Sequence, residues 1–384
     1  MGEKCLRDPR RYPWRNGEII MKKYGFIGYG LGTIHPAGIH RNTLELLKEL
    51  DKLDEGKNIE LIIPSNEIIK CEFNNIKVVK IGCIYERRSR HGKIIEKISR
   101  YYWKNIALQR YIKKNVDLSV DLLLTFPRKG SDVIAIYDCI PERMERYYND
   151  RSLRCKRRHI ISRQKRAIKK CKRIITDSNH AKRDISDFYN VEQGKIEVVY
   201  CGWQHFMEIK EDDSILKKLD LKPRGYFFSL GSRFPHKNVR WITSAAKQNP
   251  NFRFVISGQK SSFDDTSFEG DIPENVMFCG YLSDAEVKSL MRYCLAFIQP
   301  SLYEGFGIPP MEAMSVGANC IVANRTSLPE VYKDCVWYID PEDYSNIDIV
   351  RIMQQPKRSN EYVLMDYSWA KSARILLDYL KDLM

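Results

Sequence analysis

Two carboxylates, Glu304 and Glu312, stand eight positions apart in a short segment rich in glycine and proline, LYEGFGIPPMEAM. The apolar residues before this segment predict a short buried strand. Prolines at the end of the loop favour the start of a helix, because the first N–H groups of a helix have no intrahelical partner. Strand, glycine loop and helix in this order predict a βαβ unit, and open α/β sheets bind ligands at the carboxyl ends of their strands.

The loop itself has features of a ligand site. Gly305 and Gly307 flank Phe306, so the backbone can approach a ligand without an intervening Cβ atom. The helix start that follows offers N–H groups and a positive dipole end, which suit a phosphate. Either glutamate alone could be a helix cap or a solvated group. Both together in one such loop favour a binding site.

The segment EGFGIPPMEA, followed by SLPEV, resembles the Glu-x7-Glu signature of family 4 of the retaining glycosyltransferases. Those enzymes use nucleotide sugars and have the glycosyltransferase-B fold, with two Rossmann-like domains. The resemblance implies that Glu304 contacts the transferred sugar and that Glu312 contacts the ribose of the nucleotide. It also implies that Gly305, Phe306 and Gly307 lie beside the donor.

Two more segments resemble the parts of this family that bind the donor diphosphate. GSRFPHKN, at 231–238, resembles its basic loop, which implies that Lys237 and Arg233 neutralise the diphosphate. PAGIHRNTLELLKEL resembles its first glycine loop and helix, which implies that Gly38 lies next to the same group.

Two further segments resemble the parts that meet the nucleobase and the acceptor. The first of them is NVMFCGYLSDAE, whose resemblance to the part that meets the nucleobase implies that Gly280 and Tyr281 contact the base. DCIPERM resembles the segment that meets the acceptor and the reacting sugar, with Tyr137 where the family often has histidine. Asp138 is therefore either a catalytic residue that orients the acceptor or a cap of the following turn.

The order of predicted strands and helices indicates an α/β protein whose two halves are alike in architecture. The resemblance implies the glycosyltransferase-B fold, in which two Rossmann-like domains face each other across a cleft. The apolar run 121–126 is interpreted as one of its strands. In this fold the last helix commonly crosses back to the first domain. The expected parts are a basic extension, either disordered or a structured arm (1–20), an acceptor domain (21–206), a linker (207–224), a nucleotide-sugar-binding domain (225–365) and the last helix (366–384).

The charge of the chain favours an anionic partner. Lys and Arg number 64 against 49 Asp and Glu, which gives a formal net charge of +15. Basic residues alternate with apolar and aromatic ones in 86–114 and 151–173, a pattern typical of helices that lie on an anionic membrane surface. A solvated surface helix would show the same pattern. Nucleic acid is not expected as a partner, because no nucleic-acid-binding motif accompanies the charge.

The eleven cysteines include no CxxC pair and no Cys/His ligand spacing, which predicts free thiols and no structural zinc site. No apolar run approaches the roughly 18 residues that a membrane-spanning helix needs. We therefore expect a cytoplasmic protein, peripheral to the inner face of the plasma membrane.

The resemblance implies a retaining hexosyltransferase that builds O-antigen, capsule or exopolysaccharide on a lipid-linked saccharide acceptor. GDP-mannose is the favoured donor; a UDP- or dTDP-linked sugar, such as rhamnose, remains open. A glycogen synthase or phosphorylase-like enzyme is a second hypothesis, and a non-enzymatic protein that binds nucleic acid or membrane is a third. No Asp-x-Asp flanked by apolar residues is present, and fixed cations can stabilise the leaving diphosphate, so we expect neither a metal nor another cofactor.

Overall fold

The computed structural model describes residues 14–15, 18–19, 22–32, 38–84, 92–148, 150–231, 234–258 and 272–383. By the contacts between its residues, the chain divides into two compact units. The first unit comprises residues 1–135, 163–175 and 373–384, and the second comprises 136–162 and 176–372. Of the predicted N-terminal extension, only two paired strands are described, β1 (Trp14–Arg15) and β2 (Glu18–Ile19).

The larger sheet has the strand order β5-β4-β3-β6-β7-β8-β9. Its first strand in chain order, β3, is flanked by β4 and β6 in parallel register, so the direction of winding reverses there. β3 and β4 are buried along their whole length, as expected of parallel strands covered on both faces. The strands are β3 (Tyr24–Ile27), β4 (Ile59–Pro64), β5 (Lys77–Ile81), β6 (Leu118–Asp121), β7 (Val133–Ala135), β8 (Arg173–Thr176) and β9 (Ile196–Val198).

The helices that connect these strands include one wide turn. A π-helical stretch, η3 (Trp103–Ala107), joins α2 to α3, and the indole N–H of its buried Trp103 donates to the carbonyl oxygen of Ile81 at 2.7 Å. The remaining helical elements are α1 (Gly38–Asp51), η2 (Asp54–Asn58), α2 (Gly92–Tyr102), α3 (Leu108–Asn115), α4 (Ile140–Arg143), η4 (Glu145–Tyr147), α5 (Arg151–Lys170), α6 (Asn179–Tyr189) and η5 (Gln193–Lys195).

The smaller sheet has the order β12-β11-β10-β13-β14-β15, and every paired strand in it is parallel. Numbered from its first strand this order is 3-2-1-4-5-6, the doubly wound arrangement of a Rossmann fold, whose switch point lies between strands 1 and 4. Here the switch point lies between β10 and β13. The strands are β10 (Tyr226–Leu230), β11 (Arg253–Ser257), β12 (Val276–Gly280), β13 (Phe297–Gln299), β14 (Cys320–Ala323) and β15 (Trp337–Ile339).

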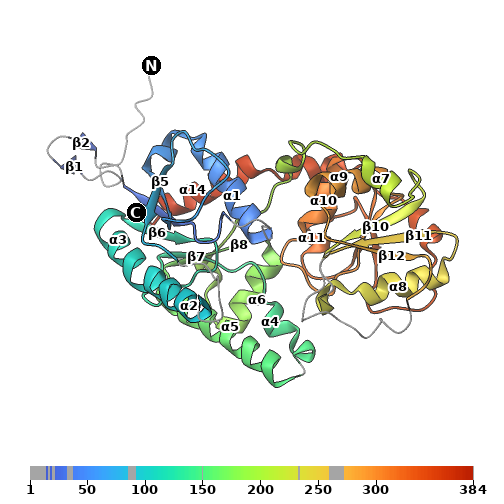
Figure 1. Cartoon of the computed structure of the whole chain (residues 1–384), viewed down its shortest axis with the longest axis horizontal. Coiled ribbons are helices and arrows are strands. Elements are labelled where there is room, and N and C mark those ends of the chain that lie inside the picture. The colour runs from blue at the N-terminus through green and yellow to red at the C-terminus, as the bar shows by residue number, and fades with distance from the viewer. Residues whose placement is uncertain are drawn as a thin grey trace, which may run out of the picture. The chain divides into compact units, whose positions relative to one another are not determined.

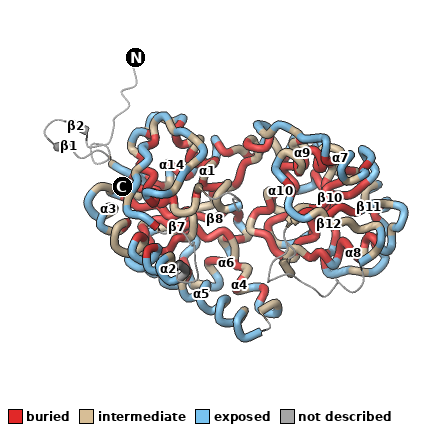
Figure 2. Tube along the Cα trace, viewed as in Figure 1, coloured by how far each residue is buried: buried red, intermediate tan, exposed pale blue. Residues whose placement is uncertain are grey.

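Helices cover both faces of the smaller sheet, with α8 on one face and α9 and α10 on the other (Figure 1). Buried residues follow its strands, whereas the outer sides of its helices are exposed (Figure 2). The helical elements after β9 are η6 (Gln204–Phe206), α7 (Ser214–Lys218), η7 (Pro235–Lys237), α8 (Val239–Gln248), α9 (Asp284–Tyr293), α10 (Ile308–Ser315), α11 (Leu328–Tyr332), α12 (Ile349–Met353), α13 (Glu361–Asp366) and α14 (Trp369–Lys381).

The apolar run 121–126 is not a strand, and that interpretation was wrong. β6 ends at Asp121, whose carboxylate accepts the backbone N–H groups of Thr125 at 3.0 Å and Phe126 at 2.6 Å. Leu124 and Phe126 take left-handed backbone conformations, with φ of 52° and 46°. The buried carboxylate therefore folds the chain into a turn immediately after β6.

Two predictions made from composition agree with the described residues. Every cysteine within them is free. None of the helices in the described ranges is both long enough and apolar enough to cross a membrane.

The core of the smaller sheet depends on Phe228, in the central strand β10. Its side chain is fully buried and meets the ring of Phe297 edge to face, with centroids 6.0 Å apart. We expect Phe228→Ala to lower the free energy of unfolding by about 3–5 kcal/mol, measured by urea denaturation. Lys222→Ala, at an exposed position in the same unit, is the control. A loss below about 1 kcal/mol would show that this ring does not anchor the core.

Candidate active site

The loops that follow β10 and β13 flank the switch point of the smaller sheet, and one ion pair joins them. Lys237 in η7 places its Nζ atom 2.7 Å from Oε1 of Glu304. The side-chain amide of Gln299, at the end of β13, donates to the same oxygen at 2.9 Å. The backbone N–H of Leu302 also donates to the carbonyl oxygen of His236 at 2.7 Å. Two residues predicted from separate motifs are thus in direct contact.

The charges of this pair are set by its surroundings. Burial by itself raises the pKa of the Glu304 carboxyl, but Lys237 and His236 outweigh it and hold that pKa below its ordinary value. Burial and the adjacent Lys237 lower the pKa of His236 to about 4. At neutral pH the loop therefore presents an ionised Glu304, a cationic Lys237 and a neutral imidazole.

The glycine loop after Glu304 is held by close backbone contacts. A Cβ atom at Gly305 would collide with the carbonyl oxygen of Tyr137, and the Ser178 hydroxyl donates to the carbonyl oxygen of Gly305 at 2.6 Å. Phe306 is buried and packs against the rings of Tyr200 and Tyr367. Phe306 was predicted to lie beside the donor together with Gly305 and Gly307; its ring is part of an aromatic cluster.

Gly307 ends the loop and starts α10. Its φ of +87° lies in the left-handed region, which glycine adopts without strain. The hydroxyl of Tyr332 donates to the Gly307 carbonyl oxygen and accepts the backbone N–H of Met311 at 3.1 Å. α10 begins at Ile308, so the two prolines stand in its first turn, as predicted.

Glu312 lies on α10 and is buried. Its Oε1 atom is 2.9 Å from Nε2 of His205, and the indole N–H of Trp369 donates to Nδ1 of the same histidine at 3.0 Å. Neither His205 nor Trp369 was predicted, because they are 164 positions apart and no local motif connects them.

Two more carboxylates, Asp138 and Asp177, follow β7 and β8. Asp138 accepts the N–H of Ile140 at 3.1 Å. Burial and the Glu304 carboxylate raise the pKa of Asp138, against the Ile140 N–H and Lys237. Burial, Asp138 and Glu304 raise the pKa of Asp177 well above its ordinary value.

Asp177 was missed in the sequence, although it directly follows the strand β8. Its Oδ1 atom and Oε1 of Gln299 are buried without a hydrogen-bond partner among the described residues. Buried polar atoms are normally paired, so these two atoms mark places where a bound ligand could supply the missing partner.

The positions of three other predicted residues give no evidence on ligand binding. Gly280, with φ of +68°, and Tyr281, 53% exposed, lie at the carboxyl end of β12. The Gly280 carbonyl oxygen accepts the N–H of Gly258 at 2.8 Å. Arg233 lies outside the described residues.

The first glycine loop binds an anion that the chain itself supplies. The backbone N–H groups of Gly30 and Gly32 donate to the carboxylate of Glu67 at 3.0 and 2.8 Å. Gly38, predicted beside a diphosphate, opens α1 in the same unit, and a Cβ atom there would meet open space. Residues 33–37, between them, are not among those described.

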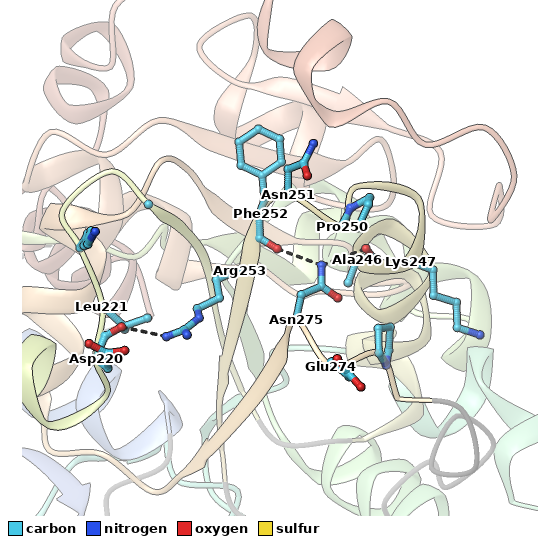
Figure 3. A pocket seen from close by; sticks show the side chains of 13 residues that line it. Asp220, Leu221, Ala246, Lys247, Pro250, Asn251, Phe252, Arg253, Glu274 and Asn275 are labelled. Carbon is cyan, nitrogen blue, oxygen red and sulfur yellow. Dashed lines mark hydrogen bonds between the residues drawn. The ribbon is translucent and has the colours of Figure 1, made fainter.

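A large cavity of about 880 Å³ lies away from these residues. It is lined by Asp220, Ala246, Phe252, Arg253 and Asn275, among others (Figure 3). Arg253 and Asn275 stand at the amino ends of β11 and β12, the opposite edge from the one where doubly wound sheets bind ligands. The Asn275 amide donates to the carbonyl oxygens of Ala246 and Phe252. We therefore assign no donor to this cavity.

Within the described ranges, no group of three or more His, Cys, Asp or Glu side chains is arranged to hold a metal ion. Lys237 is a fixed cation beside these carboxylates.

A comparison with models of known families assigns most of the second unit. Residues 211–362 match the model of the group 1 glycosyl transferases. The second unit of this chain thus contains a group 1 glycosyl transferase domain. The matched region contains the Lys237–Glu304 pair, Glu312 and the whole of the smaller sheet.

Relatives and solved structures agree with this assignment. An O-antigen chain mannosyltransferase of Salmonella typhimurium, RfbU, is 29% identical over 68% of this chain and 72% of its own length. A galactosyltransferase of Escherichia coli that acts on GlcNAc-diphosphoundecaprenol is 29% identical over 30% of this chain and 32% of its own. Sucrose-phosphate synthase of Thermosynechococcus elongatus superposes with a TM-score of 0.70 at 14% identity, covering 94% of this chain and 99% of that one. The last likeness concerns the fold alone: two Rossmann-like domains.

Removing the cation of the central pair would leave Glu304 charged and poorly compensated. We expect Lys237→Met to lower the free energy of unfolding by about 3 kcal/mol at neutral pH. The pKa of Glu304 is lowered in the folded chain. The ionised carboxylate therefore stabilises the fold at a pH above the ordinary carboxyl pKa, and this stabilisation is lost as the pH falls through the pKa that Glu304 has in the folded chain. The difference in free energy of unfolding between the wild type and the variant should therefore become smaller at acidic pH.

Denaturation curves across this pH range would measure the effect, with Lys222→Met, at an exposed position, as the control. A gap that stays constant with pH would mean that the loss is one of packing rather than of charge.

Proposed function

We propose that this glycosyltransferase moves a hexose from a nucleotide sugar to a lipid-linked saccharide during the synthesis of a surface polysaccharide. GDP-mannose is the first candidate donor. The observation that carries the proposal is the Lys237–Glu304 pair at the switch point of the smaller sheet. The names of the Salmonella and Escherichia relatives support the choice of pathway, sugar and acceptor.

Lys237 would bind the donor diphosphate. A lysine ammonium has three N–H groups, so its bond to Glu304 leaves donor capacity for phosphate oxygens. When the bond between sugar and phosphate breaks, negative charge grows on the diphosphate, and a cation already in place stabilises that charge without reorganising. We propose that the site needs no metal ion for this step.

The two glutamates would bind hydroxyl groups on either side of the diphosphate. An ionised carboxylate only accepts hydrogen bonds, and Glu304 is kept ionised by Lys237. It would hold the transferred sugar, while Glu312, fixed by His205, would hold the ribose.

Asp138 and Asp177 would act on the acceptor side. The charges of Glu304 and Lys237 both influence the pKa of Asp138. We propose that Asp138 orients the acceptor hydroxyl. In the transfer, the sugar–phosphate bond breaks, the acceptor oxygen bonds to the sugar carbon and its proton leaves with the diphosphate. We propose that the anomeric configuration is retained.

Nucleotide binding tests the donor site. We expect one of GDP, UDP and dTDP to bind in the micromolar range, and Glu312→Ala to weaken that binding about tenfold or more, because a hydrogen bond to a charged group is lost. The titration would be repeated with EDTA, which should not change the affinity. Binding of UDP or dTDP alone would select a different sugar, such as rhamnose in the dTDP case.

The matched control is Glu274→Ala, which removes a glutamate from the cavity in Figure 3. If no nucleotide binds, or if Glu274→Ala weakens binding as much as Glu312→Ala does, the assignment of the donor site is wrong.

We further propose that α2 attaches the first unit to an anionic membrane surface. Five large apolar side chains on this helix are exposed: Ile94, Ile95, Ile98, Tyr101 and Tyr102, between 47% and 63%. Their spacing places them along one face of a helix. A contiguous exposed apolar stripe is unusual on a soluble surface and commonly marks an interaction site.

Arg100 on α2 and Arg128, whose guanidinium lies over the ring of Tyr101, place cations next to this stripe. Burial and the neighbouring Arg163, Arg100 and Arg166 lower the pKa of Lys104 to about 8, with only Asp121 opposing them. Lipid phosphates would relieve this repulsion, since basic side chains near a membrane surface are attracted to anionic headgroups.

Sedimentation with lipid vesicles tests this attachment. Ile98→Asp should reduce partition onto phosphatidylserine-containing vesicles about tenfold or more, since burial of an isoleucine is lost and a negative charge is added. Ile68→Asp, at an isolated position that is 75% exposed, should have no comparable effect. Equal losses from the two variants, or no binding by the wild type, would exclude α2 as the docking face.

A further inference from the structure

A second cavity, of about 590 Å³, opens beside the candidate active site within the second unit. This is an ordinary size for a small-molecule site. Its walls come from α4, η4, the first part of α5 and the loop at η7, and they are mainly apolar or aromatic. Six of the lining residues are Ile140, Met144, Tyr147, Leu153, Ile160 and Phe234.

The wall that α5 contributes is firmly attached to the rest of the cavity. The guanidinium of Arg157 donates to the carbonyl oxygen of Pro141 at 2.6 Å and to both carboxylate oxygens of Glu145 at 2.9 and 3.1 Å. These bonds tie α5 to α4 and η4. The cavity is therefore bounded by fixed elements.

Residues in the lining of the cavity contact the candidate active site. Ile140, in its lining, donates its backbone N–H to Asp138. Tyr148, also in the lining, has its pKa raised by burial and then by the charge of Asp138. On the opposite wall, His236 interacts with Glu304. A molecule whose reacting end is at Asp138 would extend from there into the cavity.

Two basic residues, Lys156 and His159, line the cavity on α5. Both are exposed, and they stand three positions apart, so they occupy one side of the helix. The chemistry that fits this lining is an anionic group held by the basic pair and joined to an apolar chain. A saccharide without its carrier has neither part.

We propose that this cavity binds the diphosphate and the first isoprene units of the acceptor's lipid carrier. The saccharide end of the acceptor then lies at Asp138, the diphosphate near Lys156 and His159, and the chain against the apolar walls. The inference rests on the proposed function and adds to it that the protein recognises the carrier directly, rather than the saccharide alone.

Cys155 provides a direct measurement, because it is exposed and lines the cavity. Its alkylation by N-ethylmaleimide would be followed by peptide mass spectrometry, with the exposed Cys83 of the first unit as the internal reference. Farnesyl diphosphate at about ten times its dissociation constant should slow the alkylation of Cys155 roughly tenfold and leave that of Cys83 unchanged. Farnesol and inorganic pyrophosphate, each at the same concentration, should protect far less.

Two variants locate the bound probe. Ile160→Asp and Lys156→Met should each weaken farnesyl diphosphate binding about tenfold or more, because they remove an apolar contact and a charged hydrogen bond respectively. Ile98→Asp, on the α2 stripe, should leave the protection of Cys155 intact and so separates this cavity from the membrane-docking face.

Three results would overturn the inference. Equal protection by inorganic pyrophosphate would indicate a simple anion site, equal protection by farnesol would remove any role for the diphosphate, and protection by GDP or UDP would assign the cavity to the donor. If a nucleotide binds in the titration above but farnesyl diphosphate does not protect Cys155, only this inference fails. If no nucleotide binds, the proposed function fails instead.

Discussion

The ion pair between Lys237 and Glu304 is the interaction on which the rest of the site depends. It connects the two loops that leave the switch point of the smaller sheet, the position where the opposite winding of neighbouring strands leaves room for a ligand. Without the lysine, Glu304 would be a buried carboxylate beside Asp138 and Asp177, and its neighbours would favour protonation. One cation thus holds the pKa of Glu304 below its ordinary value, whereas the pKa values of Asp138 and Asp177 are raised.

This local arrangement contrasts with the charge of the chain as a whole. The formal net charge is +15, yet among the described residues Glu304 has two acids, Asp138 and Asp177, near its ion pair with Lys237. Basic residues are concentrated instead on α5 and near Lys104. The acidic centre suits neutral sugars, whose hydroxyl groups donate hydrogen bonds, and the basic surfaces suit phosphates. Substrates that combine a saccharide with a phosphorylated carrier would need both.

Much of the smaller sheet could be predicted from sequence, because its strands are compact apolar runs: YFFSL and CIVA coincide with β10 and β14. The run 121–126 was misread because apolar composition cannot distinguish a strand from a buried turn, and the bonds to Asp121 that decide it depend on the folded backbone. Lys237 and Glu304 stand in local motifs, so they were visible as candidates, whereas their contact was not. His205 became apparent only when the fold placed it beside Glu312.

The bond from Trp369 to His205 has a consequence for the role of the chain's last helix. An indole N–H can only donate, so Nδ1 of His205 must accept, and the ring proton is on Nε2, directed at Glu312. The tautomer of a single imidazole, and with it the ring nitrogen that presents a proton to Glu312, is thereby fixed by the first residue of α14. Shortening or displacing that helix would change the hydrogen-bonding character of a carboxylate that it never touches.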